Sequence, residues 1–274
     1  MKRTLIVGVG NIGSRLYKEY SAIRPDRYDP YKGIDEKNGH YDLAFICVDT
    51  PMLSDGRCDL RQVETAIRET EADTIVLRST VPPGTTDDLI QRTGQKIVFS
   101  PEFYGTTQHC DEKTFDFNFT ILGGNKQACD SVVQVLQEVY DARHRFSITD
   151  AKTAELAKYM ENTFLAAKVS LCIQFWEIAQ RYGINYAEMR ELWLQDERFN
   201  RSHSFVYADH PFWTSHCFDK DLTALTKFTS APLVQHIIDY NEYCKQRYQQ
   251  PKEMLGIDAE AQEGVYETIY GLGL

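Results

Sequence analysis

Three glycines near the start of this 274-residue chain have the spacing that phosphate-binding loops use. The segment Gly8-Val9-Gly10-Asn11-Ile12-Gly13 follows a short apolar run, Thr4–Val7, and leads into residues with helical character. Glycines at these positions permit a tight turn and let the backbone N–H groups at the start of a helix face a pyrophosphate. A tight strand-to-helix turn without a ligand is the alternative, but the position of the motif favours dinucleotide binding. The cofactor-binding residues expected in this loop are Gly8, Gly10, Asn11, Ile12 and Gly13.

An acidic residue about 20 positions beyond such a loop holds the ribose hydroxyls and favours NAD over NADP. Asp29 has this spacing, and Asp35 is the alternative. We favour Asp29 because Asp35 leaves little chain before the next strand. Arg27 and Lys32 lie nearby and keep NADP as the alternative to NAD.

Apolar runs alternate with helical patterns through the first half of the chain. The runs expected to form strands are 4–7, 43–48, 74–77, 96–99 and 119–122, and the helical patterns include 12–20, 60–69 and 126–140. The strands are continuously apolar, which is typical of a parallel sheet covered on both faces. The alternation therefore predicts an α/β fold with a Rossmann-type, doubly wound parallel sheet.

A long helix is expected after this sheet. Residues 151–182 contain neither proline nor glycine, and their apolar residues recur at helical spacing, with Asp150 as N-cap and Gly183 as the stop. Such a helix is about 50 Å long at 1.5 Å per residue. Helices of this length tend to join domains or subunits, so we divide the chain into a dinucleotide-binding domain, 1–149, and a small helical domain, 150–274.

Composition and sequence pattern argue against several classes of partner. The formal net charge of −10 argues against a nucleic-acid partner, which requires a basic surface. No apolar run approaches the roughly 18 residues of a membrane-spanning helix. The seven cysteines are scattered and form no C-x-x-C pair, which indicates neither a disulfide framework nor a metal site. We therefore expect a cytoplasmic protein with free thiols and no membrane, metal or nucleic-acid partner.

Five later segments resemble the nucleotide-sugar dehydrogenases, the family of UDP-glucose and GDP-mannose dehydrogenases, and they occur in the same order. They are FICVDTP (45–51), STVPPGT (79–85), SPEF (100–103), AELAKYMENTFL (154–165) and CFDKDL (217–222). The resemblance covers about residues 4–230 and implies NAD as cofactor and a homodimer packed through the long helix. Further cofactor-binding residues expected in these segments are Val48, Thr50, Ser79 and Thr80.

The resemblance also implies a reaction. Members of this family oxidise a sugar CH2OH group to a carboxylate in two hydride transfers, with a cysteine that forms first a thiohemiacetal and then a thioester. Cys217 matches that nucleophile and precedes a helix expected at 221–228, whose N-terminus favours a thiolate. Asp221, four residues further on, resembles the family's aspartate that handles the proton or the water.

Further roles follow from the same segments. Lys158 and Asn162 are four residues apart on the expected long helix, so both can point into one site and stabilise a negative oxygen. Glu102 resembles the general base acting on the hydrolytic water, and Thr80 the threonine that positions this water or the cofactor. The residues expected to contact the substrate are Glu102, Phe103, Lys158, Asn162 and Lys220.

The sequence departs from the family pattern at three places. Thr106 replaces a second glutamate, and Thr214-Ser215-His216 precedes Cys217 where the family has a glycine pair. Only about 50 residues follow Asp221, where the family has a C-terminal nucleotide-binding domain of on the order of 100 residues. We therefore expect a shortened form. Its substrate is a sugar smaller than a nucleotide sugar, or a nucleotide sugar held by a partner subunit or by a minimal pocket of the tail.

Two readings compete with a four-electron dehydrogenase. A two-electron dehydrogenase of the 3-hydroxyacid type also joins a Rossmann domain to helices and uses a lysine, and there Cys217 is dispensable. A non-catalytic dinucleotide-binding protein is the other alternative, although it has no need for the set of Lys158, Asn162, Cys217 and Asp221. Basic and aromatic residues in 198–213 could bind a phosphate or a ring, but an ordinary surface loop is favoured.

Overall fold

The computed structural model describes residues 2–103 and 118–249. Its contacts divide the chain into two compact units, Met1–Glu161 with Thr223–Thr229, and Asn162–Leu222 with Ser230–Leu274. None of the helices in the described ranges combines the length and the apolar character needed to cross a membrane.

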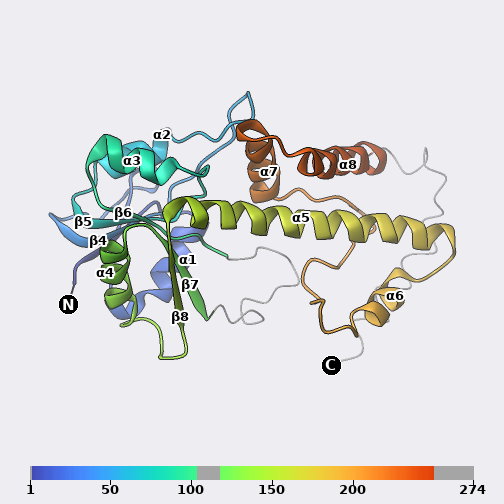
Figure 1. Ribbon diagram of the computed structural model, residues 1–274, viewed down its shortest axis with the longest axis horizontal. Helices are drawn as coiled ribbons and strands as arrows, with labels where there is room; N and C mark the ends of the chain where they lie inside the picture. Colours follow the sequence, from blue (N-terminus) through green and yellow to red (C-terminus); the bar gives the residue numbers. More distant parts are fainter. Residues whose placement is uncertain (1, 104–117, 250–274) are drawn as a thin grey trace. The chain divides into compact units, whose positions relative to one another are not determined.

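The first unit is built on a mostly parallel sheet (Figure 1). Its strands are β1 (Thr4–Val7), β2 (Asp26–Asp29), β3 (Ile34–Asp35), β4 (Tyr41–Ile46), β5 (Ala72–Leu77), β6 (Ile97–Phe99), β7 (Phe119–Gly123) and β8 (Arg145–Thr149). Their order is β3-β2-β1-β4-β5-β6-β7-β8, with antiparallel pairing only between β2 and β3 and between β6 and β7 among these strands. The strand order reverses between β1 and β4, which is the arrangement of a doubly wound Rossmann-type sheet, as predicted.

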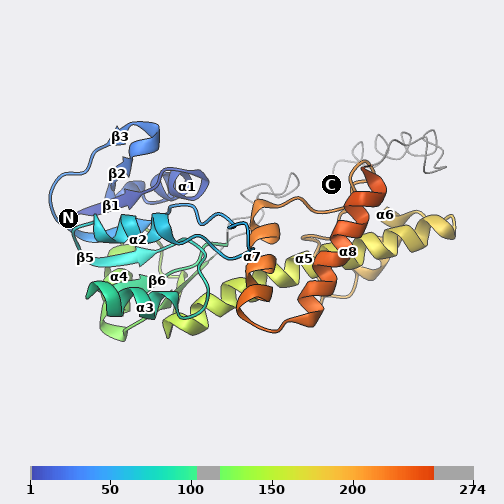
Figure 2. The ribbon, with the colours of Figure 1, turned by 90° about the horizontal axis from the view of Figure 1, so that it is seen from above.

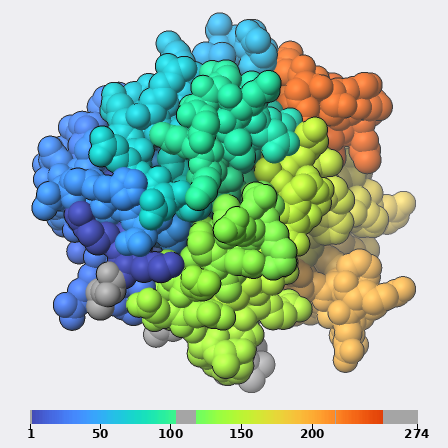
Figure 3. Space-filling view, turned by 60° about the vertical axis from the view of Figure 1, so that its left-hand side comes forward, coloured from blue at the N-terminus to red at the C-terminus, as the bar shows by residue number. Residues whose placement is uncertain are grey.

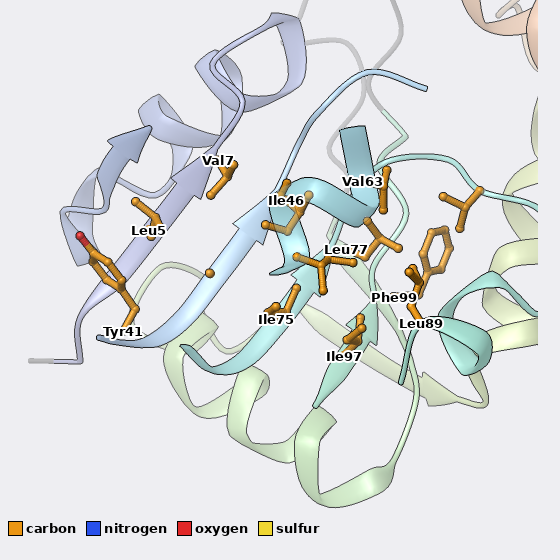
Figure 4. Close-up of a cluster of buried hydrophobic side chains, with 14 of the residues drawn as sticks. Leu5, Val7, Tyr41, Ile46, Val63, Ile75, Leu77, Leu89, Ile97 and Phe99 are labelled. Carbon is orange, nitrogen blue, oxygen red and sulfur yellow. The ribbon is translucent and has the colours of Figure 1, made fainter. Parts of the chain in front are cut away.

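Helices cover both faces of the sheet. The helices α2 (Arg61–Arg68) and α3 (Thr85–Thr93) cover one face, where Val63 and Leu89 pack against strand side chains such as Leu5 and Ile75 (Figure 4). The other face is covered by α1 (Asn11–Glu19) and α4 (Lys126–Leu136) (Figure 2). The solvent-facing sides of α3 and α4 form the blue-green and green parts of the surface in Figure 3. The central strands are apolar on both sides because both of their faces are buried.

The long helix α5 spans Ala151–Arg181. At its start, Asp150 Oδ1 accepts the Thr153 N–H at 2.8 Å. At its end, Gly183 adopts φ +64, its N–H reaches Gln180 O at 3.2 Å, and the Ile184 N–H reaches Ala179 O at 2.9 Å, which is a Schellman motif. The predicted N-cap and stop are thus confirmed.

The second unit is helical in its described part. It contains most of α5 with α6 (Tyr186–Trp193), the first half of α7 (His216–Phe228) and α8 (Pro232–Tyr248). Cys172 and Trp176 of α5 pack with Tyr186 of α6 in a small core. The start predicted for α7 was wrong by about one turn, since the helix begins at His216 rather than at residue 221. The physical reason is a cap: Ser215 Oγ accepts the Phe218 N–H at 3.4 Å.

Candidate active site

The three glycines of the predicted loop differ in what surrounds them. Gly8, directly after β1, has φ +86, and a Cβ there would lie 2.8 Å from Cys47 O. A Cβ at Gly13 would lie 1.9 Å from Gly8 O, whereas a Cβ at Gly10 would meet nothing within 4 Å. Packing therefore requires the first and third glycines, and the second leaves the N-terminus of α1 open to a ligand. This arrangement fits the pyrophosphate of a dinucleotide.

The backbone of Val9, inside this loop, is hydrogen-bonded by two side chains. One belongs to the last residue of β2, and the other to a residue that follows β2. Asp29 Oδ2 accepts the Val9 N–H at 2.8 Å, and Lys32 Nζ donates to Val9 O at 2.6 Å. Asp29 is buried at the carboxyl end of β2, which runs parallel to β1, whereas Asp35 lies exposed on β3. Asp29 thus lies beside the glycine loop, and its role as the ribose ligand stays a prediction. Arg27 instead donates from Nε to Glu36 Oε2 at 3.0 Å.

The loops that follow β4 and β5 are joined by two hydrogen bonds. Ser79 Oγ donates to Val48 O at 2.6 Å, and Thr50 Oγ1 donates to Thr80 O at 3.0 Å. Because β1, β4 and β5 are parallel neighbours, these residues lie at the same edge of the sheet as Gly8. In open α/β sheets this edge, at the reversal of strand order, is where ligands bind.

A buried ion cluster lies beyond β6. Lys158 of α5 is 4% exposed, and its Nζ lies 3.7 Å from Glu102 Oε1 and 2.7 Å from Glu161 Oε2. The same ammonium lies 5.2 Å from the centroid of the Phe103 ring. The structure thus brings together three residues that the sequence predicts to contact the substrate. A buried ammonium needs such anionic partners to offset its lost hydration.

A second polar cluster lies in the helical unit. Asn162 Nδ2 donates to Asp221 Oδ2 at 2.6 Å, and the Lys220 ammonium donates to the other oxygen of the same carboxylate. Asp221 is only 1% exposed, so both of its partners are needed to hold the charge. Cys217 lies exposed in the first turn of α7, one helical turn before Asp221. The structure thus brings together Asn162, Lys220 and Asp221, three residues that the sequence analysis assigned to the site.

Some of the expected relations among the site residues stay predictions. A common site for Cys217, Lys158 and Glu102 is one of them, since these residues belong to different units. Thr106 lies outside the described residues. Within 2–103 and 118–249, no group of three or more His, Cys, Asp or Glu side chains is arranged to hold a metal.

Two buried charged residues that support this region were missed by the sequence analysis. Glu155 of α5 is fully buried, and its carboxylate accepts the Gly84 N–H at 2.5 Å and the Thr86 N–H at 2.8 Å, which caps α3. Burial raises the pKa of Glu155, against the opposing effect of its hydrogen bonds with Thr86. Arg78 follows β5 and donates from Nη1 to Ser100 Oγ at 3.0 Å, which holds the segment that leads to Glu102. The sequence did carry a signal for Glu155, because this charged residue lies three positions before Lys158 on the face of the expected helix that is otherwise buried.

Both halves of the described chain match one protein family. Residues 6–144 match the NAD binding domain of the UDP-glucose/GDP-mannose dehydrogenase family, and residues 152–243 match the central domain of that family. The chain belongs to the UDP-glucose/GDP-mannose dehydrogenase family. This finding confirms the predicted resemblance and NAD as the cofactor of the first domain.

Individual relatives act on different nucleotide sugars. The chain is 31% identical over 216 residues to GDP-mannose 6-dehydrogenase of Pseudomonas aeruginosa, covering 71% of this chain and 48% of that protein. It is 31% identical over 196 residues to UDP-N-acetyl-D-mannosamine dehydrogenase of Methanocaldococcus jannaschii, covering 66% of this chain and 43% of that protein. The chain thus spans about half the length of these relatives.

The fold is also similar to that of solved structures. A UDP-glucose dehydrogenase from Pyrobaculum islandicum superposes with a TM-score of 0.75 at 23% identity, covering 90% of this chain and 69% of that chain. At this identity the similarity concerns the fold alone, and it agrees with the predicted sheet and long helix.

Proposed function

We propose that this protein is an NAD-dependent oxidoreductase that converts a primary alcohol of a sugar or nucleotide sugar to a carboxylate. The observation that carries the proposal is the buried Lys158–Glu102 pair beside Phe103, in the unit that contains the dinucleotide loop. A dinucleotide-binding scaffold has no need for an ammonium that is 4% exposed. The cost of burying this charge is understandable if it acts on a reacting oxygen.

Each group of the first unit has a chemical role in this proposal. Two molecules of NAD would be used in succession, each accepting the hydride of one oxidation. Gly8, Gly10 and Gly13 would accommodate its pyrophosphate, and Asp29 its ribose. The Lys158 ammonium stabilises the negative charge on the substrate oxygen, and the Glu102 carboxylate takes a proton from the water that hydrolyses the thioester.

The second unit contributes the nucleophile. The Cys217 thiolate adds to the carbonyl carbon of the aldehyde, which forms a C–S bond and leaves a thiohemiacetal. Loss of a hydride and a proton converts this to a thioester, and water then breaks the C–S bond to release the carboxylate and the thiol. Asn162 and Lys220 hold the Asp221 carboxylate one helical turn from Cys217, where it can receive or return a proton.

The stoichiometry of NADH formation tests this proposal. UDP-glucose, GDP-mannose and simple sugar phosphates are offered to the protein with excess NAD, and NADH is measured per substrate consumed. We expect two NADH for the wild type and at most one for Cys217→Ser, because serine is a much weaker nucleophile than the cysteine thiolate. Cys172→Ala, which changes a buried thiol of α5, is the matched control and should give two.

Other outcomes would contradict the proposal. One NADH per substrate in both the wild type and Cys217→Ser would support the two-electron dehydrogenase. NAD binding without turnover of any of these substrates would support the non-catalytic alternative.

We also propose that two copies of the chain pair through α5. Apolar side chains recur every four or seven residues along this helix and are about half exposed or more. They are Leu156, Met160, Phe164, Leu171 and Phe175. A contiguous row of large apolar side chains is typical of a surface that another protein covers, and a two-fold axis lets one helix cover the same helix of a second copy.

A further inference from the structure

The backbone just before Cys217 is held by one side chain of α8. Asn241 Oδ1 accepts the Trp213 N–H at 2.9 Å, and Asn241 Nδ2 donates to Trp213 O at 2.9 Å. Asn241 is 1% exposed, so water does not compete with these bonds. Because a single amide satisfies both polar groups of one residue, it fixes the orientation of the Trp213 backbone much as a neighbouring strand would.

The side chain of Trp213 in turn contacts α5 and the first turn of α7. Its indole Nε1 donates to Ser170 Oγ at 3.1 Å, and its ring lies edge to face with Phe218 at 5.9 Å between centroids. Phe218 directly follows Cys217, and both aromatic side chains are buried. The segment 214–217 is therefore held by the contacts of Trp213 on its N-terminal side and of Phe218 on its C-terminal side.

The helix that supplies Asn241 is itself anchored. Glu177 of α5 accepts the Tyr248 hydroxyl at 2.7 Å and the Tyr240 hydroxyl at 3.1 Å. Lys245 of α8 contacts the first turn of α7 directly, since its Nζ lies 3.1 Å from Asp219 Oδ1. These contacts thus join α8 both to α5 and to the segment around Cys217.

We propose that Asn241 is a positioning residue, which sets the place and reactivity of the Cys217 thiol through the backbone of Trp213. The inference rests on the proposed function of Cys217 as the nucleophile. At this segment the chain has Thr214 and Ser215 in place of the family's glycine pair. Asn241 and the Trp213 ring fix the segment here, and loss of the amide lets the first turn of α7 shift relative to Asp221.

Alkylation of Cys217 tests this role without requiring turnover. Wild-type protein, Asn241→Ala and Asn241→Asp are treated with iodoacetamide between pH 6 and pH 9.5, and mass spectrometry follows the Cys217 peptide. Asn241→Asp keeps an acceptor for the Trp213 N–H but places a buried carboxylate oxygen against Trp213 O, so its effect should be at least as large as that of Asn241→Ala. Tyr248→Phe removes a contact of the same helix with Glu177 and leaves Trp213 untouched, which makes it the matched control.

For Asn241→Ala we expect a shifted pH midpoint of alkylation and a loss of kcat on the order of 100-fold, with KM changed far less. Tyr248→Phe should lower the thermal midpoint as well, yet keep the alkylation profile and kcat of the wild type. Alkylation changes that follow the thermal midpoint equally in both variants would overturn the proposal, because they would show a merely structural role. A wild-type profile and kcat in Asn241→Ala would also overturn it.

Failure of the proposed function gives a different result. If the wild type oxidises none of the substrates and Asn241→Ala still shifts the Cys217 profile, the positioning role holds and the assigned reaction is wrong. If the wild type forms two NADH per substrate while Asn241→Ala changes neither profile nor kcat, the reaction stands and the positioning role is wrong.

Discussion

At the scale of single residues, substitutions of Gly8 and Gly10 test two different properties of the dinucleotide loop. Gly8 is needed for the stability of the fold, and Gly10 for the binding of NAD. Gly8→Ala forces a side chain into a backbone with φ +86 and against Cys47 O. We expect the free energy of unfolding to fall by more than about 1–2 kcal/mol, the cost of the left-handed conformation alone. Gly10 has φ −72, so Gly10→Ala should cost less than about 1 kcal/mol as a changed helix cap.

The same pair of variants makes a prediction for NAD. Gly10 is the N-cap of α1, and a Cβ there would occupy open space, where the pyrophosphate is expected to bind. Gly10→Ala should therefore weaken NAD binding at least about tenfold while the apo-protein stays stable. Urea unfolding without NAD and calorimetric titration with NAD measure the two effects. Wild-type affinity in Gly10→Ala would show that the pyrophosphate does not approach this position.

Much of the residue-level chemistry was predictable because local spacing determines it. The three glycines of the dinucleotide loop lie within a stretch of six residues, and Lys158 and Asn162 lie on neighbouring turns of one helix. Asn241 was not predictable in this way, since its partner is a backbone group 28 residues away. Its neighbours in sequence, Tyr240 and Glu242, resemble those of an ordinary helix surface.

At the scale of elements, the cap of α3 by Glu155 predicts an unusual dependence of stability on pH. Burial raises the pKa of this carboxyl above its unfolded value of 4.5. The folded state therefore binds the proton more tightly, and the stability that this group contributes is fully present below pH 4.5. It is lost as the pH rises through the folded pKa, by about 1.4 kcal/mol for each pH unit between the two pKa values.

Glu155→Gln removes this titration. We expect the free energy of unfolding of the wild type, minus that of Glu155→Gln, to decrease as the pH rises from 4.5 towards 8, as measured by urea denaturation. Glu138→Gln, which changes an exposed glutamate after α4, is the matched control. A difference that grows with pH would mean that the hydrogen bonds to Gly84 and Thr86 outweigh desolvation.

The elements that the sequence analysis found share one property, which is burial on both faces or along one helical stripe. The strands β1, β4, β5 and β6 read as continuous apolar runs for this reason. In contrast, β2 consists of Asp26, Arg27, Tyr28 and Asp29, and β8 has three exposed residues among its five. Hydrophobic periodicity cannot reveal such strands, because their place in the sheet depends on backbone pairing with a neighbour.

At the scale of the whole molecule, the apolar row along α5 predicts the oligomeric state. Phe164 is 61% exposed, and burying the exposed part of this ring contributes about 1–2 kcal/mol in each copy. We expect light scattering to show a dimer for the wild type and a monomer for Phe164→Glu. Leu233→Glu changes an even more exposed apolar residue, which lies on α8, and should leave the dimer intact. A monomeric wild type would remove the proposal.

The hydrogen bonds at Val9 have a consequence for the order in which the protein folds. Its N–H and C=O are bound by Asp29 and Lys32, which arrive only when the second strand has paired with the first. A peptide ending at residue 25 would therefore contain every glycine of the loop and still lack the contacts that set its shape. Nascent chain emerging from a ribosome would acquire affinity for the dinucleotide only after this later stretch had been synthesised.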